Sequence, residues 1–279
     1  MALTTYNNVP VPPFMYGTAW KKEATTQLVQ QAVEAGFTAI DTANQLIHYQ
    51  EALVGEALLL LAQQGVTRDR LFLQTKFTPT NGQDHRTPYD ASANLTTQVM
   101  QSFDSSLVHL HTGYLDSYVL HGPYQRQGLG AADWEVWAAI EGLYQSGKTK
   151  MIGISNVTAE QLTQICSQAV VKPMMVQNRC YAALGWDKEV REICRAHGII
   201  YQGFSLLTAN QGIFAEPAIR AIAQRLGTGL AQVVFRFAMQ VGMLPLTGTT
   251  NPQHMKDDLL AEQLTLTAED MQVIESIGM

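Results

Sequence analysis

The stretch Phe37-Thr-Ala-Ile-Asp41 is an apolar run that ends in a carboxylate. Three later stretches have the same form: Leu71-Phe-Leu-Gln-Thr-Lys76, Tyr118-Val-Leu-His121 and Met151-Ile-Gly-Ile-Ser-Asn156. Each of them ends in a polar residue that can take part in chemistry. In parallel α/β proteins, active sites are assembled at the carboxyl ends of the strands. Four such endings in one chain predict a single site that is built from several strands.

Eight β-type runs follow one another along the chain, near residues 14–18, 37–41, 71–76, 115–121, 150–155, 174–177, 199–205 and 243–247. Amphipathic segments lie between them, and glycines follow several of these segments, as at Gly36, Gly147 and Gly198. This alternation predicts an α/β fold, a closed (β/α)8 TIM barrel, as one domain over residues 1–279. A doubly wound open sheet is the alternative, but its GxGxxG nucleotide motif does not occur in the sequence.

The composition is 46% hydrophobic and 15% charged, and this low charge argues against disorder. The net charge is −6, and the chain has no basic block, which disfavours nucleic acid and anionic membranes as partners. Its apolar runs are too short for a membrane span, and its N-terminus does not have the form of a signal peptide. We therefore expect a soluble, cytoplasmic protein.

The three cysteines, Cys166, Cys180 and Cys194, are widely spaced and form no CxxC pair. This pattern disfavours a disulfide framework and a structural zinc site. We expect reduced, buried thiols in a reducing compartment and no metal site.

Four residues near the strand ends can together transfer a proton. A phenol such as Tyr49 has an ordinary pKa near 10, and a neighbouring ammonium, such as that of Lys76, would lower this pKa. Asp41 can pair with a buried lysine, and His121 can hydrogen-bond a carbonyl oxygen. Taken singly, each residue has an ordinary structural role: Asp41 as a helix cap or surface carboxylate, Lys76 at the surface, and His121 and Tyr49 in packing.

These segments occur in an order that strongly resembles the aldo-keto reductase family, from about Gly17 to the C-terminus. The resemblance implies that Tyr49 is the general acid, that Lys76 tunes it, that Asp41 holds Lys76 and that His121 orients the carbonyl. Many members of the family have the tyrosine closer to the aspartate, near the position of Leu46. The loop before Tyr49 is longer here, and His48 is the alternative acid.

The resemblance also implies a nicotinamide cofactor as the hydride source. Ser155, Asn156 and Gln177 match the positions that hold the carboxamide, and Phe204 matches the aromatic residue that stacks on the nicotinamide. Ser205 and Leu207 would line the pyrophosphate. The implied cofactor-binding set is Gly17, Thr18, Ala19, Asp41, Ser155, Asn156, Gln177, Phe204, Ser205, Leu207, Leu246, Gly248, Thr249, Thr250, His254, Asp257 and Asp258.

The last strand departs from the family pattern at the adenosine 2′-phosphate. Gly248, Thr249 and His254 stand where family members often have lysine, serine and arginine. Threonine hydroxyls, backbone amides and a helix that begins near Pro252 could still bind a phosphate. We expect NADPH to bind, with NADH as a possible substitute because the preference for NADPH is weakened.

Four residues would form the substrate pocket: Trp20, Phe77, Gly122 and Tyr124. Family members usually have tryptophan at the position of Gly122, and a long C-terminal tail is not evident. Both features predict a wide pocket with broad specificity for a small-molecule carbonyl substrate. The family leans towards monomers.

Two other functions remain open from the sequence. Relatives of this barrel serve as channel subunits, so a non-catalytic cofactor-binding subunit or sensor is one alternative. A barrel isomerase or lyase with a Schiff base on Lys76 is the other, although the last strands have no glycine cluster that would grip a phosphate.

Overall fold

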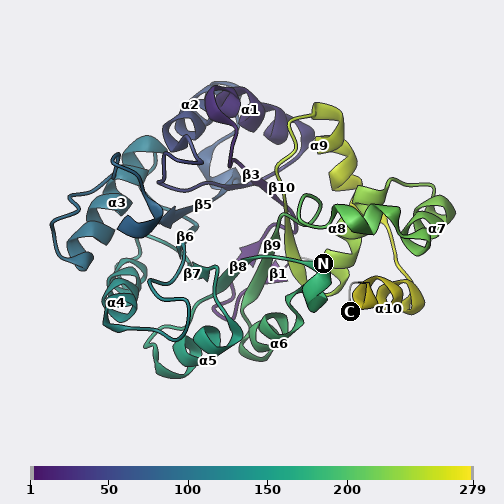
Figure 1. Ribbon diagram of the computed structural model, residues 1–279. Helices are drawn as coiled ribbons and strands as arrows, with labels where there is room; N and C mark the ends of the chain where they lie inside the picture. The colour runs from purple at the N-terminus through teal and green to yellow at the C-terminus, as the bar shows by residue number, and fades with distance from the viewer. Residues whose placement is uncertain (1–2, 278–279) are drawn as a thin grey trace.

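The computed structural model describes residues 3–277, and eight parallel strands form a closed barrel within them. The strands lie in the order β10-β3-β4-β5-β6-β7-β8-β9 around the ring, and helices surround it (Figure 1). The pairing of Leu246 with Met15 and of Thr247 with Tyr16 closes the ring between the last strand and the first. The predicted closed barrel is confirmed, and the open sheet is excluded.

All eight predicted strands are present, with bounds that differ by a few residues. The barrel strands are β3 (Met15–Gly17), β4 (Ala39–Asp41), β5 (Phe72–Phe77), β6 (Ser117–Leu120), β7 (Ile152–Ser155), β8 (Met175–Arg179), β9 (Ile200–Phe204) and β10 (Met243–Thr247). The α-helices are α1 (Thr25–Ala35), α2 (Glu51–Gln63), α3 (Leu95–His109), α4 (Ala131–Gln145), α5 (Ala159–Gln168), α6 (Lys188–His197), α7 (Pro217–Leu226), α8 (Leu230–Gln240), α9 (Pro252–Leu259) and α10 (Ala268–Ser276). Short 3-10 turns span Lys22–Ala24, Arg68–Arg70, Thr80–Gly82, Ala182–Asp187, Gln211–Ala215 and Leu260–Gln263.

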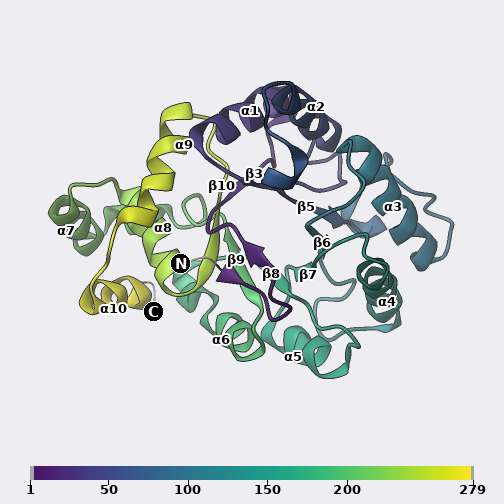
Figure 2. The same ribbon diagram turned by 180° about the vertical axis from the view of Figure 1, so that it is seen from behind.

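A two-stranded hairpin, β1 (Leu3–Thr4) with β2 (Pro10–Val11), lies across the N-terminal end of the barrel (Figure 2). Leu3 and Val9 pack against the apolar residues at the starts of the strands, and Val11 belongs to that cluster. The hairpin was not predicted, because two-residue strands are too short to show a periodicity. It covers one end of the barrel and leaves the C-terminal end as the place for a site.

The alternation of side chains along β5 sets the layers of the barrel. Phe72 belongs to the apolar cluster inside the barrel, whereas Leu73 and Phe77 belong to the core between strands and helices. Because successive strand residues point to opposite faces, Gln74 and Lys76 point inward above Phe72. The barrel interior therefore changes from apolar to polar towards its C-terminal end.

Among residues 3–277, none of the helices combines the length and apolarity needed to cross a membrane. The three cysteines are free and buried, as expected.

Candidate active site

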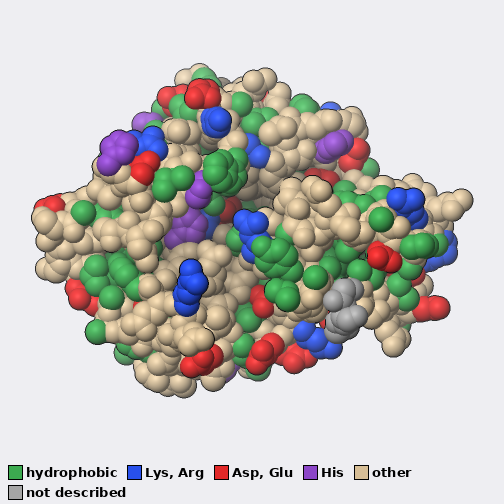
Figure 3. Space-filling model, viewed as in Figure 1, with side chains coloured by type: hydrophobic (Ala, Val, Ile, Leu, Met, Phe, Trp, Pro, Cys, Tyr) green, Lys and Arg blue, Asp and Glu red, His purple; other side chains and the backbone are tan. Residues whose placement is uncertain are grey.

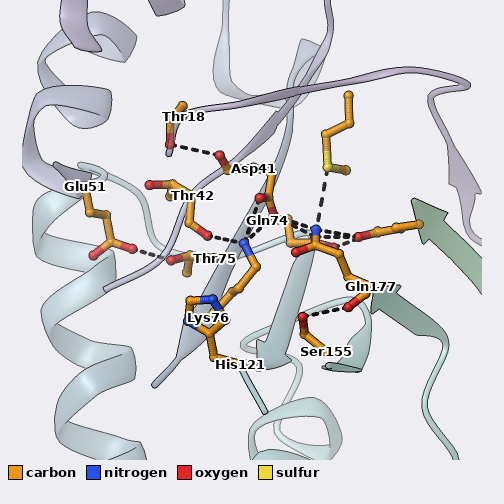
Figure 4. A network of polar contacts seen from close by, with 12 residues as sticks. Thr18, Asp41, Thr42, Glu51, Gln74, Thr75, Lys76, His121, Ser155 and Gln177 are labelled. Atoms are coloured by element: carbon orange, nitrogen blue, oxygen red, sulfur yellow. Dashed lines mark hydrogen bonds and ion pairs between the residues drawn. The ribbon is translucent and has the colours of Figure 1, made fainter. Parts of the chain in front are cut away.

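Asp41 and Lys76 form a buried ion pair at the ends of the adjacent strands β4 and β5. The Lys76 Nζ lies 2.7 Å from each carboxylate oxygen of Asp41 and 2.8 Å from the backbone oxygen of Thr42, as Figure 4 shows. These three contacts use all three ammonium protons. Burial lowers the pKa of Lys76, and the attraction of Asp41 opposes this change. The pair is thus held in a fixed geometry, as the sequence predicted.

Three inward-pointing glutamines support the Asp41 carboxylate. The amide nitrogens of Gln74 and Gln177 donate to Asp41 Oδ1 over 2.8 and 3.1 Å, and both also donate to Gln202 Oε1. Gln202 in turn donates to Gln74 Oε1 over 2.9 Å. With Lys76, the donors of Gln74 and Gln177 surround one carboxylate and hold it in place. Gln74 and Gln202 were not predicted as part of the site.

Tyr49 lies in the loop between β4 and α2, beside both charged and aromatic neighbours. Its ring centroid lies 5.2 Å from Lys76 Nζ and 5.9 Å from the centroid of the His121 ring, in an edge-on arrangement. The expected lowering of the Tyr49 pKa by Lys76 is wrong for this geometry. Burial raises the pKa of Tyr49, and the Asp41 carboxylate adds to the rise, while the Lys76 protons are engaged elsewhere. The phenol therefore keeps its proton near neutral pH.

His121 follows β6 and is fixed at both its backbone and its ring. Its backbone N–H donates to the oxygen of Phe77 over 2.9 Å, and its backbone oxygen accepts from Asn156 Nδ2 over 2.8 Å. The ring Nδ1 lies 2.7 Å from Thr78 Oγ1. Burial and the Lys76 charge lower the pKa of His121 to about 3. The imidazole is consequently neutral at physiological pH.

The rings of His48 and Trp20 are in contact on the wall of the same cavity, tilted by 51° to one another. Their ring centroids are 4.1 Å apart, and the Trp20 backbone N–H donates to the His48 oxygen over 2.6 Å. Trp20 has a left-handed backbone with φ +64° and is 65% exposed. The longer loop thus brings both Tyr49 and His48 to the cavity. Their positions alone therefore do not decide which of the two is the general acid.

A cavity of about 1110 Å³ lies at the C-terminal end of the barrel. In the space-filling view of Figure 3, lysine, arginine and histidine side chains gather near the middle of this face. The predicted residues on the cavity wall are Gly17, Ala19, Trp20, Asp41, Tyr49, His121, Gly122, Ser155, Asn156, Gln177, Phe204, Ser205, Leu207, Leu246, Gly248, Thr249, His254, Asp257 and Asp258. The structure therefore brings most of the predicted set into one site.

Comparison with known proteins matches residues 14–278 to the aldo/keto reductase family. The chain belongs to this family. Methylglyoxal reductase DkgB of Yersinia pestis is 30% identical over 271 residues, which cover 96% of this chain and 93% of that protein. Glyoxal reductase of Bacillus subtilis is 28% identical over 276 residues, covering 98% and 91%. The crystal structure of the Brucella melitensis aldo/keto reductase has the same fold, with a TM-score of 0.84, 24% identity and coverage of 99% and 98%.

Two of the predicted substrate-pocket residues do not line the cavity of this aldo-keto reductase. Phe77 is fully buried in the core between strands and helices, with its ring 5.5 Å from that of Tyr89. Because Lys76 points inward, its neighbour Phe77 must point outward. Tyr124 packs against the same core. The expected aromatic walls at these two positions are wrong, whereas Trp20 and Gly122 do line the cavity.

Three further predicted residues lie off the cavity wall. Thr18 is buried and donates its hydroxyl to the Asp41 backbone oxygen over 2.9 Å. Lys76 is fully buried, and its Nζ lies 2.7 Å from Asp41 Oδ1 and 5.2 Å from the Tyr49 ring centroid. Thr250 does not line the cavity, although its neighbour Thr249 does. Direct cofactor contact is therefore not supported for Thr18 and Thr250.

The three residues predicted to hold the carboxamide line the cavity, and their side-chain donors bond within the protein. Ser155 Oγ donates to the Gln177 backbone oxygen, Asn156 Nδ2 to the His121 oxygen, and Gln177 Nε2 to Asp41. Ser155 Oγ also accepts from Asn156 Nδ2 over 3.2 Å, so among the described residues the side-chain oxygens of Asn156 and Gln177 are the ones without a donor, and they suit the NH₂ of a primary amide.

Helix α9 begins at the place predicted for the adenosine end of the cofactor. Asn251 caps this helix: its side-chain oxygen accepts from the backbone N–H of Gln253 over 2.8 Å and from that of His254 over 3.5 Å. The Asn251 side chain thus occupies these two donors, which a phosphate would reach only by displacing it, and the anion site at the helix N-terminus stays a prediction. The Asp257 and Asp258 side chains also line the cavity here.

Several residues on the cavity wall were not predicted. They include Lys21, Gln45, Thr78 and Arg179. Lys21 Nζ donates to the Gly248 backbone oxygen, and the guanidinium of Arg179 lies 5.4 Å from the Phe204 ring centroid. Arg179 lies two residues after the inward-pointing Gln177 on β8, so the alternation of side chains along the strand could have indicated it. Lys21 and Gln45 lie in loops, where the sequence has no periodic signal.

Proposed function

We propose that this aldo-keto reductase reduces aldehydes and ketones to alcohols by hydride transfer from NADPH. The observation that carries the proposal is the convergence of the Asp41–Lys76 pair, Tyr49 and His121 at one end of the barrel. We further propose that the chain works as a single-domain, cytoplasmic monomer. Its free, buried cysteines suit a reducing compartment, and all of these residues come from one barrel.

The cavity suits a long dinucleotide together with a small substrate. Its volume of about 1110 Å³ exceeds the range of roughly 300 to 1,000 Å³ that is usual for ligand pockets. The wall extends from Trp20 and His48 to His254 and Asp257. Phe204 offers an aromatic face and Gln177 an amide oxygen where the nicotinamide would lie. When bound, the cofactor supplies a hydride to the carbonyl carbon.

Tyr49 donates the proton in this proposal. As the carbonyl carbon gains the hydride, its oxygen becomes an alkoxide and takes the phenolic proton. A phenol that holds its proton in the resting site releases it only when this stronger base forms nearby. The Lys76 charge, 5.2 Å from the Tyr49 ring centroid, offsets part of the cost that burial imposes on the resulting phenolate, although burial still keeps the pKa of Tyr49 raised in the resting site. His121 hydrogen-bonds the carbonyl oxygen and orients it.

The proposed substrates are small aldehydes, ketones and dicarbonyls. Gly122 leaves the wall beside His121 open, and Trp20 stands at the cavity with most of its surface exposed. The two relatives named as glyoxal and methylglyoxal reductases suggest dicarbonyls as the first compounds to test.

A spectrophotometric screen tests the function. The purified protein is mixed with NADPH and then with single aldehydes, ketones or dicarbonyls, and the loss of cofactor absorbance is followed while the alcohol is identified by mass spectrometry. We expect one alcohol per NADPH consumed. Absence of turnover across all three classes, with folded protein that binds NADPH, would support the non-catalytic alternative.

A further inference from the structure

Thr78 is held rigidly beside His121. It follows β5, is 3% exposed, and its backbone oxygen accepts the hydroxyl of Tyr89 over 2.7 Å. The same oxygen also accepts from Gln83 Nε2 over 3.4 Å. Its own hydroxyl oxygen lies 2.7 Å from His121 Nδ1, and the residue lines the cavity. The position of Thr78 is therefore fixed by its burial and by the hydrogen bonds to its backbone oxygen.

The direction of the Thr78–His121 hydrogen bond follows from the available partners. A threonine hydroxyl has one proton to donate, and a neutral imidazole has one N–H and one acceptor nitrogen. Among the described residues, His121 Nδ1 is the single hydrogen-bond partner of Thr78 Oγ1. If Nδ1 carried the proton, the buried hydroxyl proton would be left without an acceptor, which is costly. The hydroxyl consequently donates to Nδ1.

A neutral imidazole that accepts at Nδ1 must carry its proton on Nε2. His121 is neutral here, because burial and the Lys76 charge lower its pKa to about 3. Within residues 3–277, Nε2 has no hydrogen-bond partner, and the ring borders the cavity and lies edge-to-face with the Tyr49 ring. An N–H at this atom is a donor to a carbonyl oxygen, whereas a lone pair there would repel that oxygen.

We propose that Thr78 is a positioning residue that fixes His121 in the Nε2–H tautomer and so makes it a hydrogen-bond donor to the substrate carbonyl. The catalytic part of this proposal rests on the proposed carbonyl reduction. The tautomer itself does not, because it is a property of the protein without any substrate.

Nitrogen NMR of ¹⁵N-histidine-labelled protein at neutral pH tests the tautomer. His121→Gln identifies the His121 signals among those of the seven histidines. We expect a protonated-type Nε2 and an acceptor-type Nδ1 in the wild type and in Thr78→Ser, which keeps the hydroxyl. Thr78→Val, which has the same shape without the hydroxyl, should show a mixture of tautomers or the reversed one.

Two results would overturn the proposal: a protonated Nδ1 in the wild type, or an unchanged tautomer in Thr78→Val. If Thr78→Val does not fold, the wild-type and Thr78→Ser spectra still decide the first point.

Steady-state kinetics tests the catalytic part. Loss of one oriented hydrogen bond should lower kcat/KM for the carbonyl about tenfold in Thr78→Val. The dissociation constant of NADPH should stay the same, and Thr78→Ser should recover most of the activity. A shifted tautomer with unchanged kcat/KM would refute the positioning role. If the wild type shows the Nε2–H tautomer but reduces no carbonyl, the proposed function fails and the assignment of the tautomer stands.

Discussion

At the scale of single residues, Lys76 illustrates how a buried charge is retained. Its ammonium is fully enclosed, and its three protons go to Asp41 and to the Thr42 backbone. The sequence predicted the pair, because a lysine at an inward strand position needs a partner. It did not predict the glutamines behind Asp41, since Gln74 and Gln202 lie within strands that otherwise look like ordinary apolar runs.

Gly122 determines how much room remains beside His121. A Cβ at this position would lie 3.7 Å from the Asn156 Cβ and 3.8 Å from the Ser155 oxygen, which is ordinary contact. Gly122→Trp can therefore fold and fill the cavity. We expect kcat/KM for bulky ketones to fall at least about tenfold relative to small dicarbonyls. An unchanged ranking of substrates, at unchanged NADPH affinity, would contradict the open-wall interpretation.

At the scale of elements, the sequence predicted the eight strands because each is a short apolar run between amphipathic segments. It also predicted the left-handed glycine that ends α6, Gly198 with φ +66°. The prediction erred in the direction of one strand side chain and missed one helix cap. Phe77 was assigned to the pocket although its neighbour Lys76 fixes the opposite face, and the Asn251 cap that occupies the start of α9 was overlooked.

Helices α2 and α3 approach closely at Gly55. A Cβ there would lie 1.7 Å from the backbone oxygen of His109, so Gly55→Ala must push the helices apart. We expect a loss of about 3 kcal/mol in the free energy of unfolding, measured with urea. Gly142→Ala is the matched control, because Gly142 lies within α4 with nothing near its would-be Cβ. The free energy of unfolding of Gly142→Ala should rise by about 1 kcal/mol. Equal effects would refute the close approach.

Asp258 in α9 links stability to pH. Burial raises its pKa to about 6, and it accepts the Thr247 hydroxyl over 2.8 Å. The folded state therefore binds this proton more tightly than the unfolded state, whose pKa is about 4. Stability from this group is present below pH 4, is lost as the pH rises to about 6, and stays lost above that.

Asp258→Asn tests this link, because asparagine keeps an acceptor for Thr247 without the charge. In the absence of nucleotide, we expect the variant to exceed the wild type by about 2 kcal/mol in unfolding free energy at pH 7.5. The difference should vanish near pH 4. A variant less stable than the wild type at pH 7.5 would show that the carboxylate is favourable where it lies.

At the scale of the whole molecule, the closed barrel places parts of many strands around one cavity. The sequence predicted most of its wall because the order of the motifs follows the order of the strands around the ring. Loops contribute Lys21, Gln45 and the pair of Trp20 with His48, and their conformations depend on contacts that no local pattern encodes.

The charge distribution around the cavity bears on the choice of cofactor. His254 replaces the expected arginine, and Asp257 and Asp258 line the same end. We expect NADPH to be preferred over NADH only modestly in kcat/KM. His254→Arg should raise the ratio of the two kcat/KM values about tenfold, because a guanidinium can bind phosphate with two parallel hydrogen bonds and an imidazole cannot. His85→Arg, at an exposed position away from the cavity wall, should leave it unchanged. Equal efficiency or an NADH preference in the wild type would contradict the expectation.

The assignment of the proton donor is tested most directly by replacing, one at a time, the two candidate acids on the cavity wall. Tyr49→Phe and His48→Asn are compared for NADPH consumption with the best substrate, and NADPH binding is measured by fluorescence. We expect Tyr49→Phe to lose at least about a hundredfold in kcat with NADPH affinity intact, and His48→Asn to keep most of its activity. Retained turnover in Tyr49→Phe together with its loss in His48→Asn would contradict the role of Tyr49 and assign the proton to His48.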